Sequence, residues 1–239
     1  MNKLVIITGA TSGIGLSLAK KFSQNNYPLL LIGRRIENLN NIHLDNCIKK
    51  CVDVRNVESF KNAIEEAESI YGNCDLLINN AGLMQLGNVY NQSITEWNNM
   101  IDINLKGVFN GCHLVVEKMK QNKTGTIINM SSIAGKKATP GRAVYCATKF
   151  GVSAFSESLR QEVCSDNIRV ISICPGIVDT ELQQHTNDNS YKESLIELAK
   201  NPNTSLKPED IANIIFHTYS LPQNICIREL IITPTQQER

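Results

Sequence analysis

The sequence predicts an α/β domain in which a doubly wound, predominantly parallel sheet of about seven strands has helices on both faces. Short β-rich runs alternate with helical patterns along the 239 residues. Several of these runs are almost continuously apolar, as expected for parallel strands that are covered on both faces. A glycine-rich turn follows the first run directly. Because no repeat, low-complexity tract or Pro/Gly/Ser-rich linker divides the sequence, we expect one domain over residues 1–239.

The individual elements follow from these patterns in chain order, with right-handed connections between the strands. The last helix has a clear start signal, since Pro208 lies in its first turn with Glu209 and Asp210 behind it. The run at 47–54 is the weakest of the strands. We expect strands over 3–8, 28–33, 47–54, 75–79, 125–130, 168–174 and 225–232, and helices over 13–25, 56–71, 94–120, 143–165 and 208–220.

Residues 181–206 break this alternation. The segment is polar, contains Asn-rich turns and has only a short helical pattern. It lies between the sixth strand and the following helix, where long insertions usually serve a function. We therefore expect 181–206 to be a substrate-binding flap over a site at the carboxyl ends of the strands.

The overall composition excludes several classes of protein. A formal net charge of +1 and a pI near 7.5 offer no electrostatic attraction for nucleic acid or an anionic membrane. No apolar run approaches the roughly 18 residues of a membrane span, and the start is too weakly apolar for a signal peptide. Eight cysteines without a CxxC pair indicate reduced, mostly buried thiols. We expect a soluble, cytoplasmic protein.

The four histidines show no spacing typical of metal ligands, so we expect no metal site. One of them, His185, lies in the expected flap. It could contact a substrate there, although a solvated histidine is the more economical interpretation.

The glycine-rich turn "IITGATSGIG" places Gly9, Gly13 and Gly15 between the first strand and the first helix. Helix N-termini offer free amides and a positive dipole end, and glycines let a pyrophosphate approach the backbone. This arrangement is typical of a Rossmann-type fold that binds a dinucleotide, with Thr11, Ser12 and Ile14 also in contact. The spacing TGxxxGxG differs from the commoner GxGxxG, and the alternative is a tight turn without a ligand.

The end of the second strand favours NADP(H) over NAD(H). Where an Asp or Glu would bind a ribose 2′-hydroxyl, the sequence has Arg34 and Arg35. A guanidinium suits a 2′-phosphate better than a hydroxyl. The alternative is a solvated basic loop.

Two further strand ends are candidates for contacts with the adenosine. Asp53 and Val54 follow the third strand, where the edge of an adenine would lie. Asn80, Ala81 and Gly82 follow the fourth strand and could bring backbone beside the adenine ribose. Taken alone, each of these motifs is also a common turn or cap.

Tyr145 and Lys149 lie four residues apart in "VYCATKFG", so both side chains emerge from one face of a helix. Lowering the tyrosine pKa from about 10 by ~3 units would require ~4 kcal/mol of preferential stabilisation of the phenolate. One ammonium ~4 Å away at an effective dielectric constant of ~20 supplies ~4 kcal/mol. We therefore interpret the pair as a proton donor and a lysine that lowers its pKa. The alternative is an ordinary neighbour pair on a helix surface.

Six motifs in this order resemble the short-chain dehydrogenase/reductase family: TGATSGIG, NNAG, Asn104, Ser132, Tyr145-x-x-x-Lys149 and "PGIVDT" (175–180). The resemblance covers nearly the whole chain and is weakest over 181–206. It implies an NADP-dependent oxidoreductase that transfers a hydride between the nicotinamide and a small-molecule alcohol or carbonyl. A catalytically silent nucleotide sensor is a remote alternative, because the catalytic set is intact.

The resemblance also implies a role for each motif residue. Tyr145 would exchange a proton with the substrate oxygen, and Lys149 would bind the nicotinamide ribose as well. Ser132, chosen over Ser131 because it directly precedes "IAG", would hydrogen-bond the carbonyl oxygen. Asn104, a poor interior helix residue, would hold a water that links Lys149 to solvent. The remaining contacts would be made with the nicotinamide carboxamide by Pro175, Gly176, Val178 and Thr180.

Finer features are similar to bacterial NADP-dependent 3-hydroxy acid (serine-type) dehydrogenases. They are "IGRRIENL", "DVRN", "NNAGL", "KPEDIA" and the tail "LPQNICIRELIITPTQQ". Substrates of that kind, such as serine or 3-hydroxypropionate, need a cation for their carboxylate. Arg142 is the nearest candidate in sequence, and a surface arginine is its alternative interpretation. A broad NADPH-dependent reductase of ketones or aldehydes, or a 3-oxoacyl reductase, would share every catalytic residue.

The family resemblance further implies assembly through the long helices expected over 94–120 and 143–165, and through the last helix and strand. Small residues at 146–154 are compatible with close helix packing. We expect a homotetramer.

Overall fold

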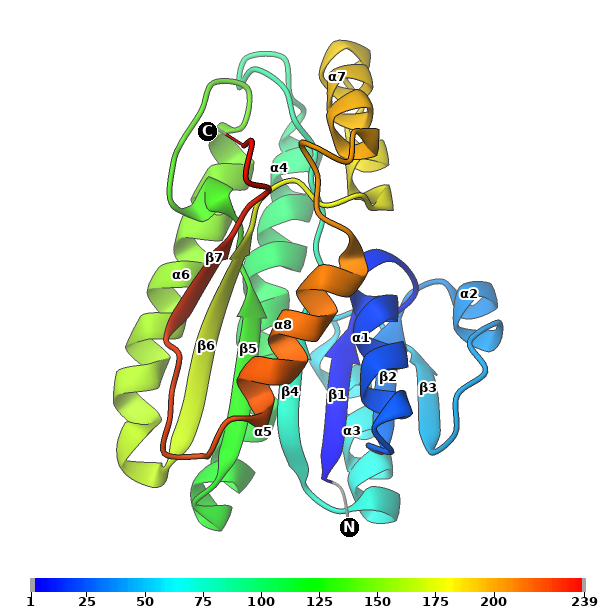
Figure 1. The fold of residues 1–239 in the computed structure, drawn as a ribbon, viewed down its shortest axis with the longest axis vertical. Coiled ribbons are helices and arrows are strands. Elements are labelled where there is room, and N and C mark those ends of the chain that lie inside the picture. The colour runs from blue at the N-terminus through cyan, green and yellow to red at the C-terminus, as the bar shows by residue number, and fades with distance from the viewer. Residues whose placement is uncertain (1–2, 238–239) are drawn as a thin grey trace.

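The computed structural model describes residues 3–237 and shows one seven-stranded sheet in which all strands are parallel (Figure 1). The spatial order β3-β2-β1-β4-β5-β6-β7 reverses direction between β1 and β4, as in a doubly wound fold. The predicted fold class is thus confirmed. The strands are β1 Leu4–Thr8, β2 Leu29–Gly33, β3 Cys47–Cys51, β4 Cys74–Asn79, β5 Gly125–Met130, β6 Ile168–Pro175 and β7 Glu229–Ile232.

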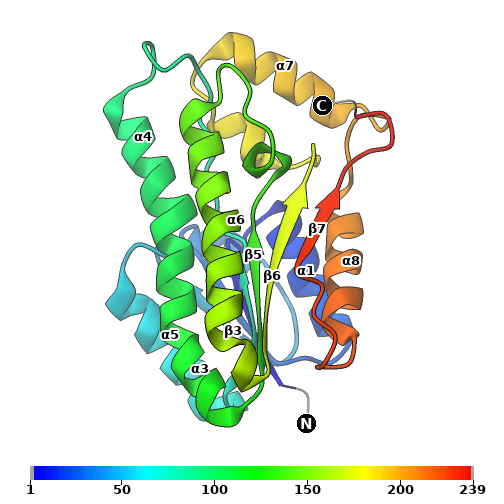
Figure 2. The ribbon, with the colours of Figure 1, turned by 90° about the vertical axis from the view of Figure 1, so that its left-hand side faces the viewer.

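Helices cover both faces of the sheet, and none within the described residues is long and apolar enough to cross a membrane. Figure 2 shows α4, α5 and α6 on one side of the sheet, α1 and α8 on the other, and α7 across the end. The helices are α1 Gly13–Gln24, α2 Ile36–Asn40, α3 Val57–Tyr71, α4 Ile94–Ile101, α5 Gly107–Asn122, α6 Ala143–Val163, α7 Asn189–Lys200 and α8 Pro208–Ser220.

Side-chain alternation along the strands builds two separate cores. Leu4 and Ile6 of β1 pack with α3, α5 and α6, whereas Val5 and Ile7 pack with α1 and α8. All four side chains are fully buried, which explains why this strand is a continuous apolar run. The sheet is therefore held from both faces, and only its ends are available for a site.

The helix expected over 94–120 is interrupted. α4 ends at Ile101, a π-helical turn spans Asp102–Lys106, and α5 follows from Gly107. A π-helical turn has wider hydrogen bonding than the surrounding α-helix and is frequent at functional sites. No hydrophobic pattern distinguishes the two kinds of turn, so the sequence predicted one continuous helix.

The strand expected over 225–232 is shorter, because β7 begins only at Glu229. The Ile225 amide donates to the Pro222 carbonyl, so the residues before β7 form a turn and not a strand. The short helix α2 was not expected either.

The segment 181–206 contains more helix than expected. A 3-10 turn at Glu181–His185 is followed by the 12-residue α7, which lies over the carboxyl end of the sheet (Figures 1 and 2). Hydrogen bonds join the two ends of the segment. The Asp179 amide donates to the Leu206 carbonyl, and the Leu206 amide donates to the Ile177 carbonyl, both at 2.9 Å.

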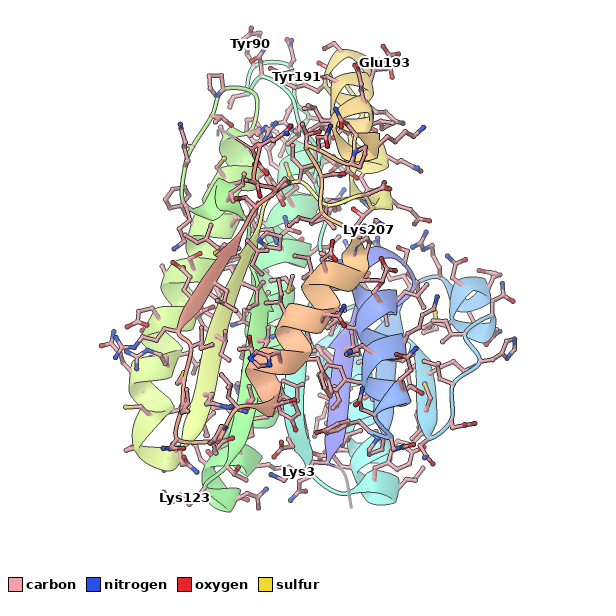
Figure 3. The ribbon with its side chains drawn as sticks, in the orientation of Figure 1. Lys3, Tyr90, Lys123, Tyr191, Glu193 and Lys207 are labelled. Atoms are coloured by element: carbon pink, nitrogen blue, oxygen red, sulfur yellow. The ribbon has the colours of Figure 1, made fainter. Side chains whose placement is uncertain are left out.

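Figure 3 shows which end of the molecule the segment occupies. Tyr191 and Glu193 of α7 lie with Tyr90 at one end, whereas Lys3 and Lys123 lie at the other, where the strands begin.

Candidate active site

A cleft runs along the carboxyl ends of the strands and collects almost all of the predicted site residues. The space within it that a water-sized sphere can enter is about 310 Å³. Of the predicted residues, only Gly15 and Asn104 lie outside its lining. Those that line it are Gly9, Thr11, Ser12, Gly13, Ile14, Arg34, Arg35, Asp53, Val54, Asn80, Ala81, Gly82, Ser132, Arg142, Tyr145, Lys149, Pro175, Gly176, Val178 and Thr180.

Two glycines of the turn after β1 are fixed by close contacts with backbone. Gly9 has φ +65°, and a Cβ there would lie 2.8 Å from the Ala81 Cα. A Cβ on Gly15 would lie 2.3 Å from the Gly9 carbonyl oxygen. Gly15 therefore serves the packing of α1 against the turn, which explains its position outside the cleft lining.

Thr8 and Asn80 join the ends of β1 and β4. The Thr8 Oγ1 accepts hydrogen bonds from the Asn80 and Ala81 amides, both at 3.0 Å. In return, the Asn80 Nδ2 donates to the carbonyls of Thr8 and Gly9 at 2.9 and 3.1 Å. The Asn80 side chain thus fixes the turn, and Thr8 is a site residue that the sequence reasoning missed. Its signal was a polar residue closing an apolar strand.

The adenosine end of the cleft contains the predicted arginines, both exposed. The Arg35 Nη2 donates to the hydroxyls of Thr11 and Ser12 at 3.0 and 2.8 Å. Its Nη1 donates to the Glu181 Oε2 at 2.7 Å. This arginine therefore links the end of β2, the glycine-rich turn and the start of the segment 181–206.

Asp53 and His185 also lie at this end of the cleft. The Asp53 carboxylate accepts from the Arg55 guanidinium, with the Nη2–Oδ2 distance at 2.7 Å, and this pairing lowers the pKa of Asp53. Its carboxylate is thus already paired, as in a turn. His185 is exposed, and its pKa is lowered by partial dehydration and by the guanidiniums of Arg35 and Arg34. It therefore lies at the adenosine end, away from Tyr145.

Tyr145 and Lys149 emerge from the same face of α6, as predicted, and both are buried, at 5% and 6% exposure. The Lys149 Nζ lies 5.8 Å from the centroid of the Tyr145 ring and donates to the Met130 carbonyl at 2.8 Å. Burial lowers the pKa of Lys149 to about 8. The ammonium is therefore still largely charged at neutral pH.

The expectation that Lys149 lowers the pKa of Tyr145 is wrong for the protein alone. Burial raises the pKa of Tyr145 to about 12, opposed by a hydrogen bond with Ser132 and by the nearby Arg142 guanidinium. The sequence argument left out the cost of removing the phenolate from water, and this cost outweighs the opposing contributions of Ser132 and Arg142. Tyr145 is consequently a neutral phenol at neutral pH.

The structure separates the two serines after β5. Ser131 is buried, and its Oγ bonds the Lys149 carbonyl at 3.0 Å and the Ser153 hydroxyl at 2.9 Å. Ser132 is only half-buried, accepts from the Ala134 amide and interacts with the Tyr145 hydroxyl. This geometry agrees with the choice of Ser132 as the residue that meets a substrate.

Asn104 lies in the π-helical turn and is 1% exposed. Its Oδ1 accepts from the Leu83 amide at 2.7 Å, and its Nδ2 donates to the Leu83 carbonyl and the Thr148 Oγ1 at 2.8 and 3.2 Å. A Cβ on Gly82 would lie 3.6 Å from the Asn104 Oδ1 and 3.9 Å from the Lys149 Nζ. Asn104 therefore fixes the loop after β4 directly beside the lysine.

The loop after β6 forms a further part of the cleft lining. A Cβ on Gly13 would lie 3.0 Å from the Thr180 Cγ2, so this loop contacts the glycine-rich turn. From the outer side, the Gly176 amide donates to the Ile232 carbonyl, and the Ile177 amide donates to the Gln237 Oε1. The C-terminal residues thus hold the loop that was predicted to contact a nicotinamide.

These residues fit a dinucleotide. The Ser12 side chain does not cap α1, so the first-turn amides of that helix are left for an anion. Exposed guanidiniums lie beyond the turn, and the Tyr145–Lys149 pair lies at the far end of the same cleft. Thr11, Ser12 and Arg35 would hold the adenosine end, and Lys149 with Thr180 would hold the nicotinamide end.

Comparison with known proteins agrees with this geometry. The sequence profile described as short chain dehydrogenase matches residues 3–190. The chain belongs to the short-chain dehydrogenase family. As a member, it is an oxidoreductase that acts on CH–OH groups of small molecules with a nicotinamide cofactor.

Individual relatives match this chain over almost its full length. An uncharacterized oxidoreductase of Staphylococcus saprophyticus is 41% identical over 99% of this chain and 97% of its own length. Sulfoacetaldehyde reductase 2 of Chromohalobacter salexigens is 32% identical over 99% and 96%. The solved closed form of serine dehydrogenase complexed with NADP⁺ has a TM-score of 0.88 at 32% identity, over 99% of this chain and 96% of that one.

The substrate end of the dehydrogenase cleft contains residues that the sequence did not single out. Met84, Leu182 and Leu195 line the cleft together with the half-buried Arg142. Leu182 and Leu195 come from the segment 181–206, and the Thr186 hydroxyl of that segment donates to the Met84 carbonyl. In the sequence, Leu182 and Leu195 are distinguished only as apolar residues within a polar segment.

Replacing Lys149 with Met should remove the free-energy cost of burying its ammonium, and this should change how the unfolding free energy depends on pH. The pKa of Lys149 is lower in the folded protein, at about 8, than the ordinary 10.5, a difference of about 3 kcal/mol. Below about pH 8 this cost is fully present, and it disappears as the pH rises toward about 10.5, where the lysine is neutral in both states. The unfolding free energy of Lys149→Met should therefore fall relative to wild type by about 3 kcal/mol over this range.

Urea unfolding of the two proteins across this pH range measures that difference. Lys20→Met, at an exposed position on α1, is the matched control and should show a flat difference. A flat difference for Lys149→Met as well would show that the ammonium is not desolvated.

Proposed function

We propose that the protein is an NADP-dependent dehydrogenase of small 3-hydroxy acids, such as serine or 3-hydroxypropionate, which it oxidises or whose semialdehydes it reduces. The observation that carries the proposal is the position of Arg142. Its guanidinium lines the same cleft as Tyr145 and is close enough to lower the pKa of that phenol by its charge. An acid bound at Arg142 would therefore have its reacting carbon beside the proton donor.

Two relatives support an anionic substrate. Serine carries a carboxylate, and sulfoacetaldehyde carries a sulfonate, each on a molecule of only a few atoms. For molecules of this size, one charge-assisted contact contributes a large share of the binding free energy. A half-buried guanidinium is the group expected for either anion.

The preference for NADP rests on Arg35. Its Nη2 already bonds the hydroxyls of Thr11 and Ser12, so one cation and two hydroxyl groups form a site for a phosphate. Arg34 adds a second exposed guanidinium at the same strand end. Neither residue would favour a free ribose 2′-hydroxyl over a phosphate.

The catalytic roles follow from the geometry of the protein groups. Bound NADPH would supply the hydride. Tyr145, neutral at neutral pH, is in the correct state to donate its proton to the oxygen of a carbonyl that is being reduced. Ser132 is placed to donate a second hydrogen bond to the same oxygen, since it already interacts with the Tyr145 hydroxyl. Oxidation of an alcohol needs the phenolate, which the Lys149 ammonium and the positive oxidised cofactor would favour.

Asn104 is proposed as a positioning residue with a role in proton supply. Both hydrogens of its amide are engaged, one with Leu83 and one with Thr148. A water that links Lys149 to solvent at this point would therefore bond to the carbonyl oxygens of Asn104 and not to its amide nitrogen. The substrate would be enclosed by 181–206, which we propose is the flap of a single domain.

A reductase of neutral ketones or aldehydes is the second candidate. The apolar side chains of Met84, Leu182 and Leu195 beside Tyr145 favour it, because they would contact an uncharged carbon skeleton equally well. The two candidates share the reacting groups and differ only in the use of Arg142.

Initial rates of cofactor reduction should separate the candidates. The purified protein should reduce NADP⁺ faster than NAD⁺ with L-serine, allo-threonine or 3-hydroxypropionate, and more slowly with neutral secondary alcohols. Tyr145→Phe should lower kcat about 100-fold or more while cofactor binding is retained, since proton transfer contributes ~10²–10⁴. Turnover of the neutral alcohols alone would leave the mechanism in place and refute the acid substrate.

Arg142→Gln should raise KM selectively for the acids, by about ten- to a hundredfold, because a charge-assisted hydrogen bond is lost. KM for neutral alcohols should stay within about twofold. The matched control is Arg160→Gln, which removes a guanidinium paired with Glu157 on the same helix. Equal effects on acids and neutral alcohols would show that Arg142 acts only through α6 or Tyr145.

We also propose a homotetramer. Ile101 of α4, Phe150 of α6 and Ile231 of β7 are exposed apolar side chains, and they lie on the elements expected to form its interfaces. Light scattering should give four times the 26.6 kDa of one chain. A mass of one or two chains would contradict the tetramer.

A further inference from the structure

The ion pair between Arg35 and Glu181 lies in the part of the cleft where the 2′-phosphate is expected. The Arg35 Nη1 donates to the Glu181 Oε2 at 2.7 Å, while its Nη2 donates to the hydroxyls of Thr11 and Ser12. The Ser12 hydroxyl in turn donates to the Glu181 carboxylate. One carboxylate thus shares the cation and a hydroxyl with the site proposed for the phosphate.

We propose that Glu181 is a specificity-determining residue that competes with the 2′-phosphate of NADP(H) for Arg35 and so limits the preference for NADP over NAD. The inference rests on the proposed function, because it assumes that Arg35 binds the phosphate. Carboxylates and phosphates accept from a guanidinium in the same way, so a phosphate would compete with Glu181 for the Nη1 of Arg35. Two anions bound to the same guanidinium would also repel each other.

The charge state and exposure of Glu181 meet the requirements of this role. The hydrogen bond from Arg35 lowers the pKa of Glu181, so the carboxylate is ionised at neutral pH. Both side chains are about half exposed, at 46% for Arg35 and 45% for Glu181. An exposed ion pair contributes little net stability, which makes it readily exchanged for a doubly charged phosphate.

The position of Glu181 in the chain extends the effect to the flap. It is the first residue of the 3-10 turn that opens the segment 181–206, and Thr180 caps this turn through the Leu182 amide. Leu182 lines the substrate end of the cleft. A 2′-phosphate that displaced Glu181 from Arg35 would therefore change a contact at the start of the flap, whereas a 2′-hydroxyl would not.

Adenosine fragments without a nicotinamide test the inference independently of turnover. Binding of 2′,5′-ADP and 5′-AMP is measured by isothermal titration calorimetry for wild type and Glu181→Gln. The variant should bind 2′,5′-ADP about three- to tenfold more tightly, as loss of a competing surface charge predicts, with 5′-AMP unchanged within about twofold. Glu193→Gln removes the same charge from an exposed position on α7 (Figure 3) that does not line the cleft, and should change neither affinity.

A double-mutant cycle identifies the partner. In an Arg35→Gln background, Glu181→Gln should no longer strengthen 2′,5′-ADP binding, because the group that it competes for is absent. Equal tightening of both fragments by Glu181→Gln would indicate a general opening of the cleft and overturn the inference. Weaker 2′,5′-ADP binding would show that Glu181 holds Arg35 in place for the phosphate, and would overturn it as well.

The same titrations separate this inference from the proposed function. If wild type binds 2′,5′-ADP no more tightly than 5′-AMP, the NADP preference is wrong and the role of Glu181 is wrong with it. If wild type favours 2′,5′-ADP and Glu181→Gln changes nothing, only the role of Glu181 is wrong.

Discussion

The hydrogen bonds between Thr8 and Asn80 are the constraint on which the rest of the site depends. They join the ends of β1 and β4, the point at which the strand order reverses and at which a doubly wound sheet opens a crevice. Because the two turns lie in contact here, Gly9 has no space for a side chain. Loss of these bonds would let the glycine-rich turn and the loop beside Lys149 move independently. The two parts of the cleft would then no longer be held at a fixed distance from each other.

Burial decides the chemistry of the reacting pair more than the mutual charge of its members does. Tyr145 and Lys149 are both nearly inaccessible, and burial raises the pKa of the phenol and lowers that of the ammonium. The two pKa values move apart from nearly equal ordinary ones, to about 12 for Tyr145 and about 8 for Lys149, so at neutral pH the pair is a neutral phenol and a largely charged ammonium. A positively charged ligand ring beside Tyr145 would lower the pKa of the phenol and so oppose the effect of burial on it. The protein alone therefore holds Tyr145 as a neutral phenol, the state that the proposed proton donation requires.

Local signals predicted the parts of the fold that local physics controls. The start of α8 at Pro208 and the one-turn spacing of Tyr145 and Lys149 needed only helix geometry. The π-helical turn at Asn104 could not be predicted, because it depends on hydrogen bonds to Leu83, which is 21 residues away. The pairing of Arg35 with Glu181 spans 146 residues and leaves no trace in either neighbourhood. The sequence predicted which residues face the cleft far better than it predicted which of them bond one another.

The bonds of Leu206 to Ile177 and Asp179 have a consequence for changes made to the segment between them. An isolated parallel bridge between Val178 and Leu206, just beyond β6, closes the segment between them into a loop with a fixed base. Closing a longer loop costs little extra entropy once the base is fixed. Changes within α7 would leave this base intact, whereas changes at Glu181 would reach Arg35 and the glycine-rich turn. A graft of another relative's segment onto the Ile177–Leu206 base would therefore have to keep the contacts of Glu181 with Arg35 and of Thr186 with Met84.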